Sequence, residues 1–319
     1  MVDVPAHRPR RSFYPWLDRR GDFSALKAAF FALVLAPGLW LLGQAVAGAL
    51  GPRPWIEANH QSGLWAIRFL LLSLAVTPLR TIWRWPDLIA MRRMLGLAVF
   101  AYVLVHLAAY AGDLGWNIAE VASEIIARPY LLIGFIALII LTPLAVTSTD
   151  GMMRRMGGLR WRVLHRLVYP IAALGTVHFF WQSKLGVTEP MAIAAIAVWL
   201  GLWRLLAARI GSERAGSLAM TAALAVLIVM ATGLAEALYY HLKIGVPLAR
   251  VLEANVAWKS GLRPAWIVLV VAGIVLTLAL IRIPLAARKR SRRVRGKGGE
   301  TATPIAARRA GDQISAPKG

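Results

Sequence analysis

Residues 92–112 read RRMLGLAVFAYVLVHLAAYAG, in which two arginines precede a long apolar run that contains one histidine, His106. A helix needs about 20 predominantly apolar residues to cross the hydrocarbon core of a bilayer. The run is long enough to do so, and the two arginines mark one of its ends. This stretch therefore predicts a membrane-crossing helix with a histidine inside it.

Eight apolar runs of this kind occur along the chain. We place the predicted spans near residues 28–50, 63–79, 94–112, 129–147, 163–181, 191–208, 216–240 and 264–283. The composition agrees, because 58% of the 319 residues are hydrophobic, only 16% are charged and the mean hydropathy is +0.60. The sequence thus predicts an all-α integral membrane protein, a bundle of about eight transmembrane helices, and excludes a disordered chain.

The basic residues are unevenly divided between the two sides that alternating spans create. If residue 1 is cytoplasmic, 29 of the 37 Lys and Arg residues lie on the cytoplasmic side. The segments that hold them are 1–27, 80–93, 148–166, 204–214 and 282–319. Because cytoplasmic loops carry an excess of Lys and Arg, we expect both termini in the cytoplasm. The basic residues that give the net charge of +22 thus follow the membrane topology. We therefore predict the lipid bilayer as a partner and no nucleic-acid partner.

The chain has no cysteine, which excludes disulfides, cysteine-ligated iron–sulfur clusters and covalently attached c-type haem. Two of its six histidines, His106 and His178, fall inside spans at matching depth. His106 follows Arg93 by thirteen residues, and His178 follows Arg162 by sixteen and Arg166 by twelve, which places both histidines roughly 18–24 Å from the cytoplasmic boundary. Two histidines at equal depth on helices of the same direction can face each other across a planar ligand. This arrangement favours bis-histidine haem over a packing role for each histidine.

Two further residues leave alternatives open. His165 precedes His178 by thirteen residues, about 20 Å closer to the cytoplasm, and no histidine stands near Arg93 at the base of the third span to pair with it. His165 is therefore either a ligand of a second, inner haem or an interfacial packing residue. Arg68, near the outer end of the second span, either pairs with a haem propionate or extends to the outer interface.

Several short motifs occur in a fixed order around these residues. They are GLWAIRFLLLSLAVTPLR at 63–80, RRMLG at 92–96, RPY at 128–130, TST at 147–149 and LH at 164–165. With His106 and His178, this set resembles the MsrQ family, whose members are haem-binding membrane subunits of the bacterial methionine-sulfoxide repair system. That family is similar to the ferric-reductase-like transmembrane superfamily, and the resemblance covers residues 28–208.

The resemblance implies b-type haem held by His106, His165 and His178, together with bound FMN. It also implies a place in the bacterial inner membrane, electrons from the quinone pool and delivery to MsrP, a periplasmic molybdopterin enzyme that performs the sulfoxide chemistry. No residue is assigned to FMN or quinone. The alternatives are a ferric or other metal reductase of the same superfamily and, in a different class, a small-solute transporter.

These features divide the chain into four predicted parts. They are a basic cytoplasmic N-terminus at 1–27, a haem-binding core at 28–208, two additional transmembrane helices at 209–284 and a basic, disordered cytoplasmic tail at 285–319. The two additional helices depart from the family pattern, in which chains usually end near residue 209. Neither contains a histidine inside the membrane, so we expect no haem there.

Overall fold

The computed structural model describes residues 14–17, 21–183, 186–257 and 261–300, with the backbone alone over 287–300. The helices are α1 (Ala25–Val46), α2 (Pro54–Ile82), η1 (Pro86–Met91), α3 (Arg92–Asp113), α4 (Ile118–Ala127), α5 (Pro129–Val146), α6 (Asp150–Met156), α7 (Gly158–His165), α8 (Val168–Gln182), α9 (Thr188–Ile210), α10 (Ser212–Ala215), α11 (Leu218–Ile244), α12 (Leu248–Val256) and α13 (Pro264–Glu300). Within the described residues the chain forms no sheet, and eight helical segments are long and apolar enough to cross a membrane. The predicted all-α membrane fold is confirmed.

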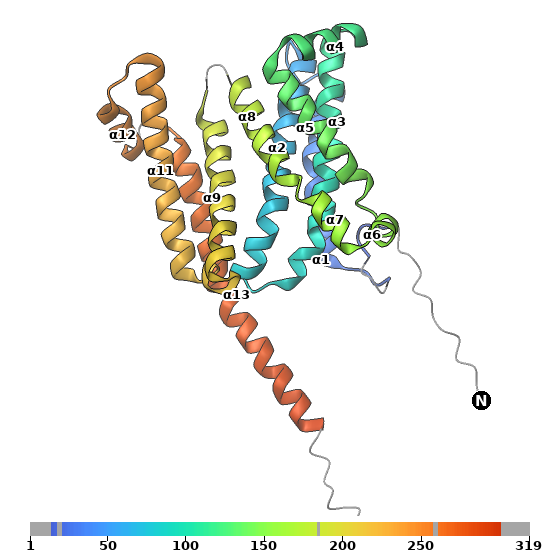
Figure 1. The fold of residues 1–319 in the computed structure, drawn as a ribbon, viewed down its shortest axis with the longest axis vertical. Coiled ribbons are helices and arrows are strands. Elements are labelled where there is room, and N and C mark those ends of the chain that lie inside the picture. The colour runs from blue at the N-terminus through green and yellow to red at the C-terminus, as the bar shows by residue number, and fades with distance from the viewer. Residues whose placement is uncertain (1–13, 18–20, 184–185, 258–260, 301–319) are drawn as a thin grey trace, which may run out of the picture.

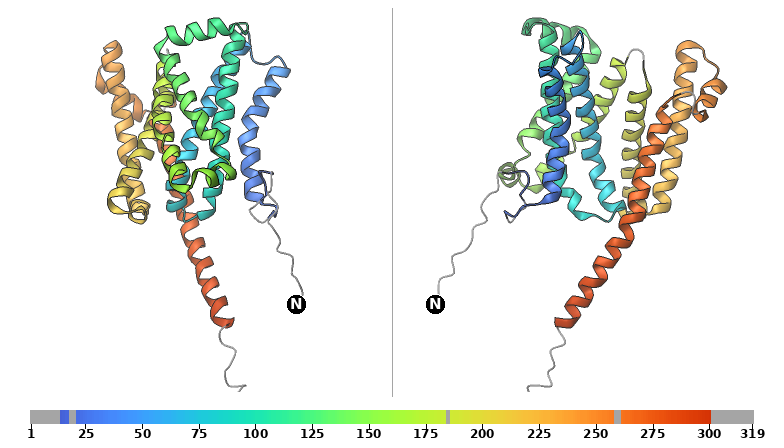
Figure 2. Two further views of the ribbon diagram at one scale, coloured as in Figure 1. Left: turned by 45° about the vertical axis from the view of Figure 1, so that its right-hand side comes forward. Right: turned by 180° about the vertical axis from the view of Figure 1, so that it is seen from behind.

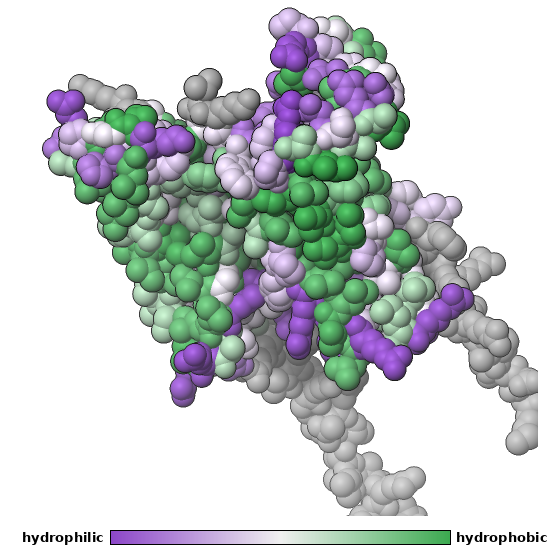
Figure 3. All heavy atoms as spheres, turned by 45° about the horizontal axis from the view of Figure 1, so that its top comes forward, coloured by the Kyte–Doolittle hydropathy of each residue, from purple (hydrophilic) through white to green (hydrophobic). Residues whose placement is uncertain are grey.

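The spanning segments alternate in direction and form one bundle (Figure 1). We call the end that carries α6 and α10 the inner end, and the end that carries α4 and α12 the outer end. Figure 3 shows an apolar flank between polar zones at the two ends, as expected of a surface that faces lipid. Proline at the first helical position begins α2 and α5, which explains why α2 begins nine residues before the predicted span.

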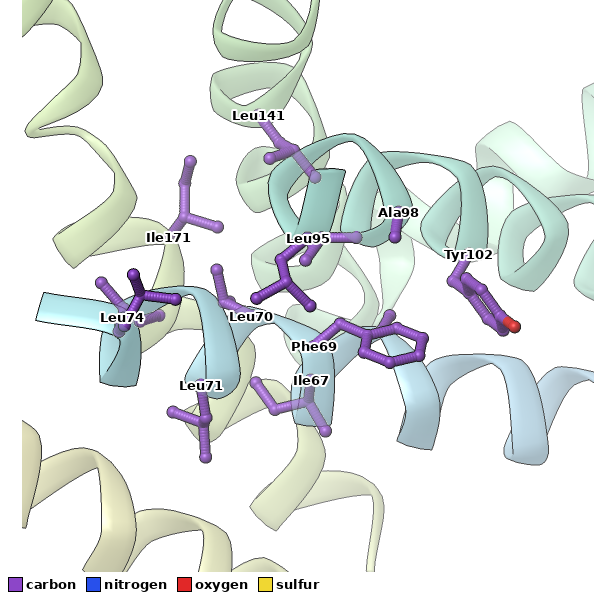
Figure 4. Close-up of a cluster of buried hydrophobic side chains, with 14 of the residues drawn as sticks. Ile67, Phe69, Leu70, Leu71, Leu74, Leu95, Ala98, Tyr102, Leu141 and Ile171 are labelled. Carbon is purple, nitrogen blue, oxygen red and sulfur yellow. The ribbon is translucent and has the colours of Figure 1, made fainter. Parts of the chain in front are cut away.

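The most buried helix is α2, which packs chiefly against α3 (Figure 4). Phe69 and Leu70 of α2 and Leu95 of α3 are almost completely enclosed. In lipid, close packing of this kind replaces the hydrophobic effect as the main force between helices. The α2–α3 pair is therefore the rigid centre on which the other helices are placed.

A proline inside α2 is compensated by a cation from another helix. Pro78 has no N–H group, so the Leu74 carbonyl loses its regular helical donor. Arg204 of α9 donates one hydrogen bond to the Leu74 carbonyl and another to the Leu200 carbonyl, at 2.8 Å. Its Nε also donates to the Tyr169 hydroxyl of α8, at 3.3 Å. Arg204 thereby ties three helices together inside the bundle.

The two C-terminal spans, α11 and α13, pack against α9 on one side of the bundle (Figure 1). Trp199 and Trp203 of α9 contact this pair through a shared apolar cluster. At the inner end, the Trp83 indole donates to the Val275 carbonyl of α13 at 2.9 Å, and Arg282 lies 3.7 Å above the Trp85 ring. The extension therefore also contacts the core beyond α9.

An ion pair closes the outer end of this extension. The carboxylate of Glu236 in α11 is fully buried and accepts hydrogen bonds from Arg263 at 3.0 Å and from the Asn255 amide at 2.8 Å. A buried charge is costly in a membrane unless it is paired, and this pairing folds α12 back onto α11.

The C-terminal tail differs from the sequence-based expectation. The sequence predicts disorder from residue 285, whereas α13 continues as one helix to Glu300 and projects beyond the inner end (Figure 2). Residues 287–297 are rich in Arg and Lys, which are good helix formers, and they extend a helix that is already nucleated. The rest of the tail, 301–319, and most of the predicted N-terminal segment 1–27 lie outside the described residues.

Candidate functional site

A cavity of about 560 Å³ lies between α2, α3, α5 and α8. Its size falls within the range of cofactor pockets, about 300–1,000 Å³. His106 of α3 and His178 of α8 line it, and most of the remaining wall is apolar, including Val99, Leu141 and Ile171. The structure thus brings together the two histidines that the sequence places at equal depth.

The imidazole rings of His106 and His178 are separated by the distance that a shared metal needs. Their ring centroids are 6.2 Å apart and the ring planes are inclined at 85°. A metal–nitrogen bond of about 2.0 Å on each side places two axial imidazole centres roughly 6 Å apart. The distance between the two ring centres is therefore compatible with one metal ion held between the two imidazoles.

Each ring is oriented by a backbone carbonyl of a neighbouring helix. His106 Nδ1 lies 2.8 Å from the Asn59 carbonyl oxygen of α2, and His178 Nδ1 lies 2.7 Å from the Tyr130 carbonyl oxygen of α5. A carbonyl oxygen can only accept, so Nδ1 carries the proton in both rings. The Nε2 lone pair of each histidine is then available for a metal, the arrangement that metal-binding histidines commonly show.

Asn59 makes a second bond to the same ligand helix. Its side-chain amide donates to the His106 carbonyl oxygen at 2.9 Å, so Asn59 and His106 are joined both ways across the α2–α3 contact. Asn59 lies outside the predicted second span at 63–79, so the apolar pattern did not indicate it as a site residue. Its place, four positions before the start of that span, was the one feature of the sequence that could have indicated a polar residue near the site.

The polar groups of the cavity wall gather toward its outer end. His60 of α2, Tyr110 of α3 and Gln182 at the end of α8 line the cavity there. Leu70, nearer the inner end of α2, is apolar, like its neighbours on that wall. The site is therefore amphiphilic, with an apolar inner part and a polar outer part, which suits an apolar ring system that carries carboxylates on one edge.

His165 lies apart from this cavity, as the last residue of α7. Its Nδ1 donates to the Trp161 carbonyl at 3.0 Å, and its Nε2 is 3.4 Å from the Ser148 hydroxyl. The ring stacks on Trp161 with centroids 3.9 Å apart. Its titratable neighbours are Arg92 and Arg93, which stand at the base of α3. Among the described residues, the structure gives His165 no histidine partner across a cavity.

The fifth predicted span is broken between its two histidines. The α7 helix ends at His165 and α8 begins at Val168, with Pro170 in its first turn. The break gives α7 and α8 separate axes, so the position of His165 does not follow from that of His178 by regular helical rotation.

Arg68 has a protein partner. Its guanidinium lies 3.1 Å from the Glu189 carboxylate of α9 and 5.0 Å from the centre of the Trp65 ring. Arg68 is not among the residues that line the cavity. Contact between Arg68 and a haem propionate therefore stays a prediction, without support from this arrangement.

Known proteins resemble this chain over the same region. The family model of the ferric reductase like transmembrane component matches residues 62–176. A protein of Polaromonas naphthalenivorans is 44% identical over 183 residues, which is 56% of this chain and 84% of the relative. A protein of Xanthomonas campestris is 45% identical over 195 residues, covering 58% of this chain and 89% of the relative. No solved structure matches this fold significantly.

Both relatives are named as the protein-methionine-sulfoxide reductase heme-binding subunit MsrQ, as is a protein of Xanthomonas oryzae that is 45% identical over 193 residues. The matches cover most of each relative but little more than half of this chain, so a large part of this chain lies outside them. The identity and the coverage of the relatives show that this chain belongs to the MsrQ family of ferric-reductase-like membrane proteins.

Proposed function

We propose that this chain binds one b-type haem between His106 and His178 and serves as a membrane electron-transfer subunit. The observation that carries the proposal is the pair of carbonyl-oriented imidazoles, 6.2 Å apart across an apolar cavity. The names of the related proteins, which describe them as heme-binding, support the same cofactor.

The residues of the cavity would hold the haem and set its surroundings. His106 and His178 would hold the iron through their Nε2 atoms, and the Asn59 and Tyr130 carbonyls would increase the basicity of those nitrogens through their bonds to Nδ1. The apolar wall excludes water and keeps the local dielectric low. When bound, haem supplies a one-electron iron couple, and the protein tunes the potential of that couple through these ligands and this burial.

The direction of electron flow follows from the position of the site. We propose that both termini lie in the cytoplasm of a bacterium and that the outer end faces the periplasm, in keeping with the distribution of Lys and Arg. The polar end of the cavity would then lie toward the side where MsrP, the periplasmic molybdopterin subunit, would accept electrons. The quinone pool in the bilayer would donate them. FMN, which the family resemblance implies, is proposed without assigned residues.

A second haem at His165 has weaker support than the first. The Trp161 ring covers one face of the imidazole, and the Ser148 hydroxyl stands at its Nε2. The described residues offer no second axial nitrogen beside it. We therefore assign His165 no metal in the proposed function.

The proposal is tested on the full chain in bacterial membranes. A reduced-minus-oxidised absorbance spectrum with haem quantified per chain should show a b-type haem that an added quinol reduces. An inserted but colourless protein would reject the haem site. A quinol-reducible haem that fails to pass electrons to the periplasmic reductase would reject the proposed partner and leave the haem site standing.

A further inference from the structure

Each of the two histidine rings lies directly against a glycine of the helix that orients it. A Cβ atom placed on Gly63 would come within 2.7 Å of His106 Nδ1 and 2.8 Å of its Cε1. A Cβ atom on Gly134 would come within 2.9 Å of both Nδ1 and Cε1 of His178. Atoms do not approach this closely without a shift, so only glycine leaves room for the rings where they are.

The two glycines have the same relation to the two carbonyl acceptors. Gly63 follows Asn59 by four residues, and Gly134 follows Tyr130 by four. In an α-helix the N–H of residue i donates to the carbonyl of residue i−4, so each acceptor is the carbonyl that its glycine also uses. The imidazole can reach a carbonyl that lies within a helix because the glycine one turn later has no side chain to cover it.

The rings have little freedom to yield to an added methyl group. On one side Nδ1 is fixed by its hydrogen bond to the carbonyl, at 2.8 Å for His106 and 2.7 Å for His178. On the other side Nε2 would be fixed by iron. A displaced ring must lengthen one of these two bonds, and either change alters how the histidine coordinates.

We propose that Gly63 and Gly134 are positioning residues that set the orientation of the two axial histidines. This inference rests on the proposed haem site and goes beyond it. It assigns the orientation of each ring to the space left by a glycine that has no side chain. The mutual angle of 85° between the rings follows from the same contacts, because each ring plane is fixed by its own helix pair, α2 with α3 and α5 with α8.

The ring angle can be measured without any substitution. Perpendicular axial imidazoles give oxidised low-spin haem a strongly anisotropic EPR signal with one very large g value, whereas parallel imidazoles give an ordinary rhombic signal. The wild-type chain should show the strongly anisotropic signal. A rhombic signal from wild-type protein would overturn the assignment even if no glycine variant folds.

The substitutions Gly63→Ala and Gly134→Ala test whether the missing side chains at these two glycines are needed to position the histidine rings. Each should weaken haem retention by about 10- to 100-fold, the usual cost of losing an outer partner of a metal ligand. The haem that remains should lose the strong anisotropy or become partly high-spin. This spectral change separates a positioning role from a general loss of stability.

Two glycines of α3 provide matched controls. A Cβ on Gly96 meets nothing within 4 Å, so Gly96→Ala should leave the haem signal unchanged. A Cβ on Gly112 would approach the Trp55 ring to 2.7 Å, so Gly112→Ala crowds the same helix without touching a ligand. It should lower stability but keep the wild-type EPR signal.

The outcomes separate this proposal from the proposed function. If Gly63→Ala and Gly134→Ala keep wild-type haem retention and EPR signals, or if Gly112→Ala changes the signal as they do, the positioning role is rejected. A wild-type chain without haem rejects the proposed function itself.

Discussion

The outer and inner halves of the bundle place their histidines in different surroundings. In the outer half, His106 and His178 face each other across a cavity, and each ring donates a hydrogen bond from Nδ1 to a backbone carbonyl of another helix. In the inner half, His165 donates to the Trp161 carbonyl of its own helix and stacks on that tryptophan. A histidine inside a membrane protein is thus prepared for a metal by a partner from another helix and by open space at Nε2, rather than by depth alone.

The largest effect should come from removing either outer histidine. His106→Ala and His178→Ala should each abolish the bis-histidine haem spectrum, because each change removes one of the two imidazoles that would hold the iron. The measurement is the reduced-minus-oxidised spectrum per inserted chain. His241→Ala is the matched control, since His241 lies at the outer end of α11 and bonds the Val246 carbonyl. A full wild-type spectrum in either outer variant would contradict the pairing of His106 with His178.

A smaller effect is expected at Asn59. Asn59→Leu removes the amide that donates to the His106 carbonyl but keeps the backbone oxygen that accepts from Nδ1. Hydrogen bonds between membrane helices contribute about 0.6–1.7 kcal/mol, so haem retention should fall about 3- to 20-fold. Gln61→Leu, which loses only a bond to Glu57 on the same helix, should bind haem like wild type. Equal losses of haem in both variants would show that Asn59 has no specific role in haem binding.

Removal of the C-terminal helices should loosen the inner end of the bundle and leave haem binding in the outer half unchanged. A chain that ends after residue 212 keeps every residue that lines the cavity but loses the contacts of α13 with Trp83 and Trp85 at the inner end. Haem per inserted chain should stay near the wild-type level, while the inner loop at 83–91 becomes more accessible to protease. Loss of haem from an inserted truncation would show that the extension belongs to the core.

The smallest effect on the outer haem is expected from His165→Ala. The change removes the stack on Trp161 and the contact with Ser148, neither of which reaches the cavity. Haem content and the EPR signal should therefore match wild type within error. If this variant inserts and loses all haem, the inner histidine is a ligand and the contrast between the halves is wrong.

Much of the fold could be predicted because a bilayer restricts it severely. Its thickness fixes the length of a span, so the apolar runs alone gave all eight helices within a few residues at most ends. The exceptions have local causes. Proline at the first position extends α2 outward to Pro54, and the break after His165 divides the fifth span into α7 and α8.

Part of the site could be predicted for a similar reason. The rise of a helix is fixed, so counting residues from Arg93 and Arg166 was enough to place His106 and His178 at the same depth. Arg68 shows the limit of this reasoning. Its depth left two alternatives open, a propionate contact or extension to the outer interface, and did not indicate the ion pair with Glu189 of α9.

The sequence by itself therefore determined the membrane class, the spans and the depth of each histidine, because these depend on local composition and on a constant rise per residue. Only the tertiary structure decided which faces of the helices meet. The carbonyls of Asn59 and Tyr130 are backbone groups that every residue possesses, so no residue type marks them as acceptors. They become partners of His106 and His178 because close helix packing at Gly63 and Gly134 leaves the rings within reach of them.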